Sequence, residues 1–128
     1  MKKLITLSIL TLSVLGAECL DHNGIKLNTQ TNLMWSTPAS TSLTWSGAQT
    51  YCSNLIEGGY SDWMLPNINQ LESERVNFGE TEVCFTPNFE WSTTFKSSTD
   101  AYKMDAAHVV LDTDRTNTNP VRCVRSNQ

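Results

Sequence analysis

The chain has 128 residues, with nine basic and 13 acidic side chains and a formal charge of −4. This length is enough for one domain with a modest buried core. The acidic balance argues against duplex nucleic acid as a partner, because the phosphate backbone binds basic surfaces.

Residues 1–17 have the pattern of a secretory signal peptide. Met1-Lys2-Lys3 is followed by an apolar or small-residue run to Gly16, which is too short to span a bilayer as a lasting helix. We expect cleavage after Ala17. The mature domain, residues 18–128, then keeps seven basic and 13 acidic residues, a formal charge of −6. The pattern predicts an exported protein of the periplasm or cell surface with no stable membrane span.

The cysteines of the mature part are Cys19, Cys52, Cys84 and Cys123. An even number of cysteines on an exported chain predicts two disulfides, and the spacing alone leaves all three pairings open. A zinc site needs closely spaced ligand pairs, which these cysteines and the two distant histidines do not provide. We therefore expect no metal and no cofactor.

The first part of the mature chain predicts a hairpin from Leu20 to Trp35. Ile25 and Leu27 alternate with polar neighbours, residues 28–32 are rich in turn formers, and residues 33–35 form a short apolar run. Residues 36–42 read as a loop.

A helix is then expected after Thr44, a good N-cap residue. Trp45, Ala48, Cys52 and Leu55 recur at spacings of three, four and three, and Gly58-Gly59 is expected to end the helix. Cys52 should therefore face the core, where a thiol is a structural cross-link and not a nucleophile.

A corner is predicted between Tyr60 and Glu72. Pro66 favours an extended Leu65, and Asn67 with Gln70 can form a variant of the capping box at the start of a second helix that runs to about Val76. Trp63 is expected in the core together with Leu65.

The rest of the chain is predicted to contain an acidic stretch followed by β-strands. Five carboxylates between Glu72 and Glu90 lack the spacing of a calcium loop and read as a solvated face. Strands are expected at residues 91–94, 101–105, 108–112 and 121–125. Residues 112–117 read as a polar turn. On the last strand, Val121 and Cys123 share one face.

Five blocks in order resemble the Lcl C-terminal-domain family of exported bacterial domains: L-M-W at 33–35, T-W to Y-C at 44–52, G-Y-S-D-W-M-L-P at 59–66, W-S-T at 91–93 and V-R-C-V-R at 121–125. The family is similar in motif to formylglycine-generating-enzyme-like and C-type-lectin-like folds. The resemblance implies an α+β, C-type-lectin-like domain with two helices packed on small antiparallel sheets. It also implies that Cys52 pairs with Cys123, which leaves Cys19 for Cys84.

The resemblance favours a non-catalytic binding module for a glycan or an envelope protein, in keeping with adhesin relatives that bind sulfated glycans. The charge of −6 argues against a polyanionic ligand here. A formylglycine-generating-enzyme-like catalyst, which would use reactive cysteines, is an alternative. So is a structural component of the envelope or of pilus assembly that docks through the acidic face.

We expect any ligand site to lie on loops, at residues 86–95 and 112–120, while Trp45 and Trp63 belong to the core. A stacking face with amide and carboxylate groups suits a neutral sugar or a peptide. No catalytic residue is predicted. The candidate binding residues are Phe89, Trp91, Asp112, Asp114, Arg115 and Asn117.

Overall fold

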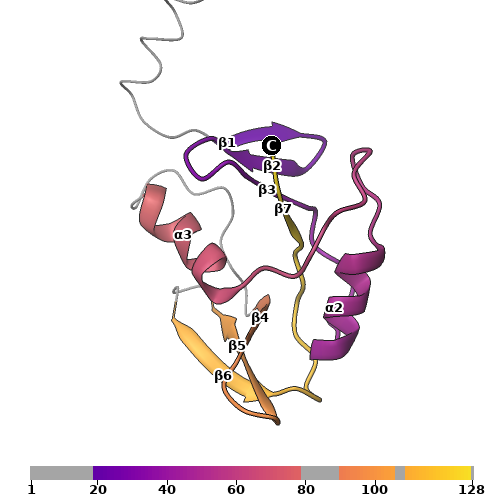
Figure 1. Cartoon of the computed structure of the whole chain (residues 1–128), viewed down its shortest axis with the longest axis vertical. Coiled ribbons are helices and arrows are strands. Elements are labelled where there is room, and N and C mark those ends of the chain that lie inside the picture. The colour runs from indigo at the N-terminus through magenta and orange to yellow at the C-terminus, as the bar shows by residue number, and fades with distance from the viewer. Residues whose placement is uncertain (1–18, 79–89, 106–108, 128) are drawn as a thin grey trace, which may run out of the picture.

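The computed structural model describes residues 19–78, 90–105 and 109–127. Their elements are β1 (Cys19–His22), β2 (Ile25–Asn28), β3 (Leu33–Trp35), α2 (Trp45–Asn54), α3 (Ile68–Phe78), β4 (Glu90–Phe95), β5 (Asp100–Met104), β6 (Val110–Asp114) and β7 (Val124–Ser126). One sheet lies at each end of this part of the molecule, and the helices lie on opposite sides between them (Figure 1). The α+β class predicted from the sequence is confirmed.

The first sheet has the order β1-β2-β3-β7, with each neighbouring pair antiparallel. The expected pairing of residues 25–28 with 33–35 is confirmed. An additional strand, β1, joins β2 through Asn23 and Gly24, both with positive φ (56° and 91°). Asn-Gly suits such a turn because both central residues of a type I′ hairpin need positive φ. The Gly24 amide also donates to Asp21 Oδ1 at 2.9 Å, which fixes the turn.

Helix α2 begins as the sequence predicts and ends earlier. Thr44 is its N-cap, and the Thr44 Oγ1 accepts from the Gly47 amide at 3.2 Å. Ala48 and Cys52 are buried on the inner face. The predicted stop at Gly58-Gly59 is wrong, because the backbone is already extended at Leu55. The two glycines instead adopt positive φ in a turn between Glu57 and Tyr60.

The corner at Pro66 has the predicted reciprocal cap. The Gln70 amide donates to Asn67 Oδ1 at 2.8 Å, and the Asn67 amide donates to Gln70 Oε1 at 2.9 Å. Both bonds satisfy donors that a helix start leaves without intrahelical partners. Trp63 and Leu65, on the arm before the corner, are buried as predicted.

The second sheet has the order β4-β5-β6 and is tied to the rest of the fold through β4. The Trp91 amide donates to the Pro120 carbonyl at 3.1 Å, and the Thr93 amide donates to the Pro66 carbonyl at 2.7 Å. The strands predicted at 91–94 and 101–105 are confirmed within a residue or two. The third lies two residues later than predicted, and His108 is outside the described residues.

The chain end returns to the first sheet and is cross-linked to helix α2. Cys52 bonds Cys123 with a Cα–Cα distance of 5.6 Å, so the pairing implied by the resemblance is confirmed. In the chain-entropy model a closed loop of this length stabilises by about 4 kcal/mol. Cys19 is also disulfide-bonded, and its expected partner, Cys84, lies outside the described residues. Strand β7 begins only at Val124, later than predicted, although Val121 and Cys123 are both buried.

The acidic stretch is not a uniformly solvated face, which corrects the prediction. Glu74 is fully buried, and its Oε2 accepts from Trp35 Nε1 at 2.8 Å and Asn28 Nδ2 at 3.0 Å. Glu90 is also buried, with Arg122 Nε at 3.7 Å from its Oε2. Charge runs indicate solvent exposure only on average, whereas these two acids meet buried donors. Glu80 and Glu82 lie outside the described residues.

Glu74→Leu should lower the free energy of unfolding by about 3 kcal/mol, because the Trp35 and Asn28 donors lose a buried acceptor. Glu72→Leu, on the same helix and only half-buried, is the matched control, and we expect a change within about 0.5 kcal/mol. Urea denaturation of the two variants and the parent measures both values. Equal stability of the two variants would show that the buried carboxylate does not hold the sheet to the helix.

Candidate functional site

One hollow lies on the face of the first sheet that points away from helix α3. Strand register places Leu20 opposite Leu27, Leu27 opposite Met34 and Met34 opposite Arg125. Directly paired residues point to the same side of a sheet, so these four side chains form one row across all four strands. The opposite face carries Trp35 and Val124, which pack in the core with Leu71 of the helix.

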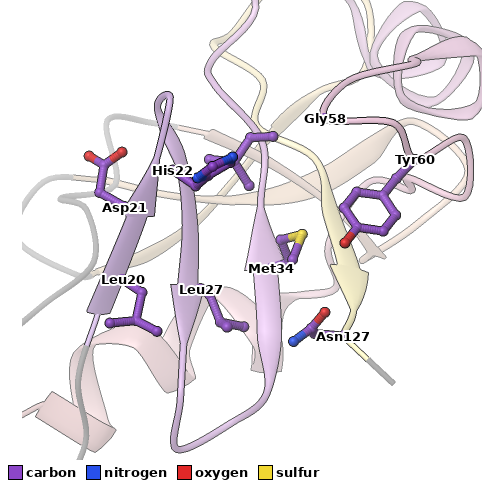
Figure 2. Close-up of a pocket in the computed structure, with 9 residues that line it drawn as sticks. Leu20, Asp21, His22, Leu27, Met34, Gly58, Tyr60 and Asn127 are labelled. Carbon is purple, nitrogen blue, oxygen red and sulfur yellow. The ribbon is translucent and has the colours of Figure 1, made fainter.

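Leu20, Leu27 and Met34 of this row form the floor of a groove of about 490 Å³, called here the sheet groove (Figure 2). The Leu20 side of the floor is open, with 48% of that residue exposed, whereas Met34 is only 8% exposed. His22 and Tyr60 stand on opposite sides of Met34 in Figure 2. The lining residues are Leu20, Asp21, His22, Ile25, Leu27, Met34, Gly58, Tyr60 and Asn127.

The Tyr60 wall of the groove is held by Arg125 of β7. The Arg125 Cζ lies 3.7 Å from the centroid of the Tyr60 ring, and the Trp63 ring meets Tyr60 edge-on at 6.4 Å. Arg125 Nε and Nη2 donate to the two carboxylate oxygens of Asp62 at 2.6 and 3.2 Å. Such a bidentate pair fixes the guanidinium plane, so the Tyr60 ring has a rigid neighbour on one face.

The charged groups beside the sheet groove are paired. Lys26 donates to Asp21, and this hydrogen bond lowers the pKa of the Asp21 carboxyl. The hydrogen bond from Arg125 lowers the pKa of the Asp62 carboxyl and raises that of Arg125. Both acids therefore stay ionised and balanced at neutral pH. Asp21 and Asp62 therefore add no unpaired carboxylate to the rim of the groove.

Three polar side chains at the rim are not engaged by the protein. Within the described part of the chain, no hydrogen bond uses the side chains of His22, Tyr60 or Asn127, although the backbone of Asn127 pairs with Asn32. These groups stand around an apolar floor and can supply donors and acceptors to a bound molecule. An apolar floor with few free polar groups is the usual composition of a ligand site.

A second, shallower hollow of about 360 Å³ lies at the start of helix α2, lined by Thr44, Trp45, Ser46, Arg115 and Thr116; we call it the Trp45 hollow. The Arg115 Cζ lies 4.1 Å from the Trp45 ring centroid and 5.0 Å from that of Phe95. Arg115 Nη2 also donates to the Ser97 carbonyl. Trp45 Nε1 donates to the Ser92 carbonyl at 2.7 Å, which sets the ring orientation.

Trp45 and Trp91 differ in burial from what the sequence predicts. Trp45 packs against the buried core, as predicted, but it is only partly buried and also forms a wall of the Trp45 hollow. Trp91 is fully buried and its Nε1 donates to the Leu43 carbonyl at 2.7 Å. It therefore offers no stacking face to a ligand. Phe89, the other aromatic candidate, lies outside the described residues.

Of the remaining predicted site residues, Arg115 lines a hollow, whereas Asp112, Asp114 and Asn117 are occupied by other side chains or amides. Asp112 pairs with Lys96 at 3.3 Å. Asp114 Oδ1 accepts from the amide and hydroxyl of Thr116, and these bonds lower the pKa of Asp114. Asn117 Nδ2 donates to Thr113 Oγ1 at 2.9 Å. The predicted polar turn is confirmed only at residues 115–117, because residues 112–114 belong to strand β6. The side chains of Asp112, Asp114 and Asn117 line neither hollow.

The residues of the sheet groove were not predicted from the sequence. The signal for them is the short pattern around Asn23-Gly24. Leu20 and His22 precede this pair, Ile25 and Leu27 follow it, and one charged residue separates the members of each couple. An Asn-Gly pair between two alternating segments indicates a tight hairpin, and this register brings the leucines together.

Among the described residues, no cluster of three or more histidine, cysteine or carboxylate side chains is arranged to hold a metal ion. None of the described helices combines the length and apolarity needed to cross a membrane.

Comparison with protein families matches residues 24–125 to the model described as the Lcl C-terminal domain. The match includes every element from β2 to β6 and the first two residues of β7. No curated protein matches the chain.

Asp62→Asn should make the stability of the fold less sensitive to pH in the acid range. The pKa of Asp62 is held below its ordinary value of 3.8, so the pair with Arg125 stabilises the fold above that value and is lost as pH falls through the lowered pKa. We expect Asp62→Asn to lower Tm at pH 7 and to lose less stability than the parent on acidification below about pH 4. Circular dichroism melts recorded at pH 7 and below about pH 4 measure both effects.

Arg125→Gln should produce the same change, and the double variant should add little to either single one, because both remove one interaction. Parallel acid curves for parent and variants would contradict the role of this pair.

Proposed function

We propose that this chain, which belongs to the Lcl C-terminal domain family, is an exported, non-catalytic binding module that holds part of a carbohydrate or protein partner at the bacterial envelope in its sheet groove. The observation that carries this proposal is the composition of the groove. A row of apolar side chains on rigid strands is bordered by His22, Tyr60 and Asn127, whose polar groups the described part of the protein leaves available. Such a site binds by shape and burial and orients its ligand with few hydrogen bonds.

The covalent state of the cysteines supports a non-catalytic role. A formylglycine-generating-enzyme-like catalyst would need reactive thiols, whereas Cys52 and Cys123 are joined to each other and buried. In the described residues, His22 at the groove rim makes no hydrogen bond to a carboxylate that would orient it as a general base.

The same disulfide supports export and the C-type-lectin-like relationship. Disulfides persist in oxidising compartments such as the periplasm and the cell surface. A bond from a core helix to the end of the chain is the connection that the lectin-like resemblance implies. A structural envelope component that docks through an acidic face gains less support, because Glu74 and Glu90 of that face are buried.

A mixed panel of uncharged fragments, methyl glycosides and capped amino-acid amides, should perturb the amide resonances of the groove strands in heteronuclear NMR. Leu20→Lys places a cation at the open side of the floor, and we expect it to weaken the binding fragments about tenfold. Leu111→Lys is the matched control, because Leu111 is also an exposed leucine on an edge strand, 36% exposed on β6.

Both variants should fold with stability within about 0.5 kcal/mol of the parent, since both sites are exposed. Perturbations that cluster at the Trp45 hollow, or equal losses in the two variants, would move the site away from the sheet groove.

A further inference from the structure

Resting on the proposed function, we infer that the sheet groove receives an aromatic side chain from an extended segment of a protein partner. Three features of the groove carry this inference: the chemistry of its floor, the number of its free polar groups and the position of β1.

The floor is aliphatic and contains a thioether. Leu20, Leu27 and Met34 follow one another across three strands, and the Met34 sulfur already lies 3.7 Å from Arg125 Nη1, which orients the side chain. Thioether sulfur makes favourable contacts with aromatic rings, usually at the ring edge. Tyr60 adds an aromatic wall, one face of which is covered by Arg125.

The polar groups of the groove are too few for a sugar. A hexose ring carries hydroxyls around its whole edge, and each one buried without a partner costs about 1–3 kcal/mol. Only three side chains at the rim, His22, Tyr60 and Asn127, have polar groups that the described part of the protein does not use. An aromatic side chain needs one hydrogen bond or none, so it can cover the apolar floor without this loss.

The charges around the groove favour an uncharged occupant. Asp21 is paired with Lys26, and Asp62 is paired with Arg125. A charged ligand group would have to compete with one of these pairs or leave its own charge without a partner.

The position of β1 favours a protein partner. In the described structure β1 is the terminal strand of its sheet, and Leu20 to His22 are exposed. The outer edge of such a strand offers backbone amides and carbonyls to an added strand, while its side chains alternate between the faces. A segment bonded to this edge lies three strand spacings, about 14 Å, from Met34, so its backbone must continue from the edge over the open Leu20 side for one side chain to reach the rest of the floor. Main-chain pairing and one aromatic anchor then act together.

Three uncharged probes of matched size test the inference: capped Ala-Phe-Ala, capped Ala-Leu-Ala and a methyl hexoside, each titrated into the full mature domain and followed by NMR. We expect the phenylalanine peptide to perturb the β1 and β2 amides and to bind about tenfold more tightly than the hexoside. It should also bind more tightly than the leucine peptide. Met34→Leu, which keeps the apolar floor, should weaken the phenylalanine peptide about threefold and leave the leucine peptide unchanged.

Each outcome has a separate meaning. Preference for the hexoside in the groove overturns the inference and leaves the proposed function standing. Equal binding of the two peptides, or no response to Met34→Leu, overturns the aromatic preference. Saturation of the groove by none of the probes at millimolar concentration removes the inference together with the proposed site.

Discussion

The disulfide between Cys52 and Cys123 is the constraint on which the rest of the structure depends. It joins the buried face of α2 to the segment that carries Arg122, Val124 and Arg125. The Val124 backbone then pairs in both directions with Met64, at 2.8 and 2.9 Å. Helix, corner and first sheet are therefore fixed to one another within a few residues of the cross-link. In a domain of this size, one such link is a large share of a net stability of about 5–15 kcal/mol.

The two buried carboxylates extend this framework at both ends of the described structure. Glu74 joins α3 to β2 and β3 through the Asn28 and Trp35 donors, and Glu90 lies beside Arg122 next to the cross-linked segment. A buried carboxylate is costly unless hydrogen bonds or an opposite charge compensate it, so these acids specify which elements can meet. Acidity in this chain therefore has a structural part as well as a solvating one.

Local features could be predicted from the sequence because they depend on near neighbours. The Thr44 cap, the reciprocal Asn67–Gln70 cap and the inward phase of Cys52 all follow from residues within a turn or two. The degree of burial of Trp45 and Trp91 could not be assigned correctly, because neither helix phase nor strand alternation tells which other segment covers a side chain. Trp45 stands at the first turn of α2, where Arg115 covers it only partly, whereas Trp91 is enclosed in the core.

The groove residues escaped prediction for a related reason. Alternation places Leu20 and Leu27 on a face of some sheet, but only the strand register aligns them with Met34 and Arg125. That register depends on the turn at Asn23-Gly24 and on the return of the chain end to β3, a contact between residues about 90 positions apart. Long-range pairing of this kind has no local signature in the sequence.

The difference between the two hollows lies in what their polar groups already do. In the Trp45 hollow, the Arg115 guanidinium stacks on two rings and donates to the Ser97 carbonyl, so its position is set by the protein itself. Beside the sheet groove Asp21 and Asp62 are paired in the same way, yet the side chains of His22, Tyr60 and Asn127 have no hydrogen-bond partner among the described residues. Binding energy comes from groups that gain partners only when the ligand arrives. By that criterion the sheet groove is built for recognition, and the Trp45 hollow is part of the scaffold.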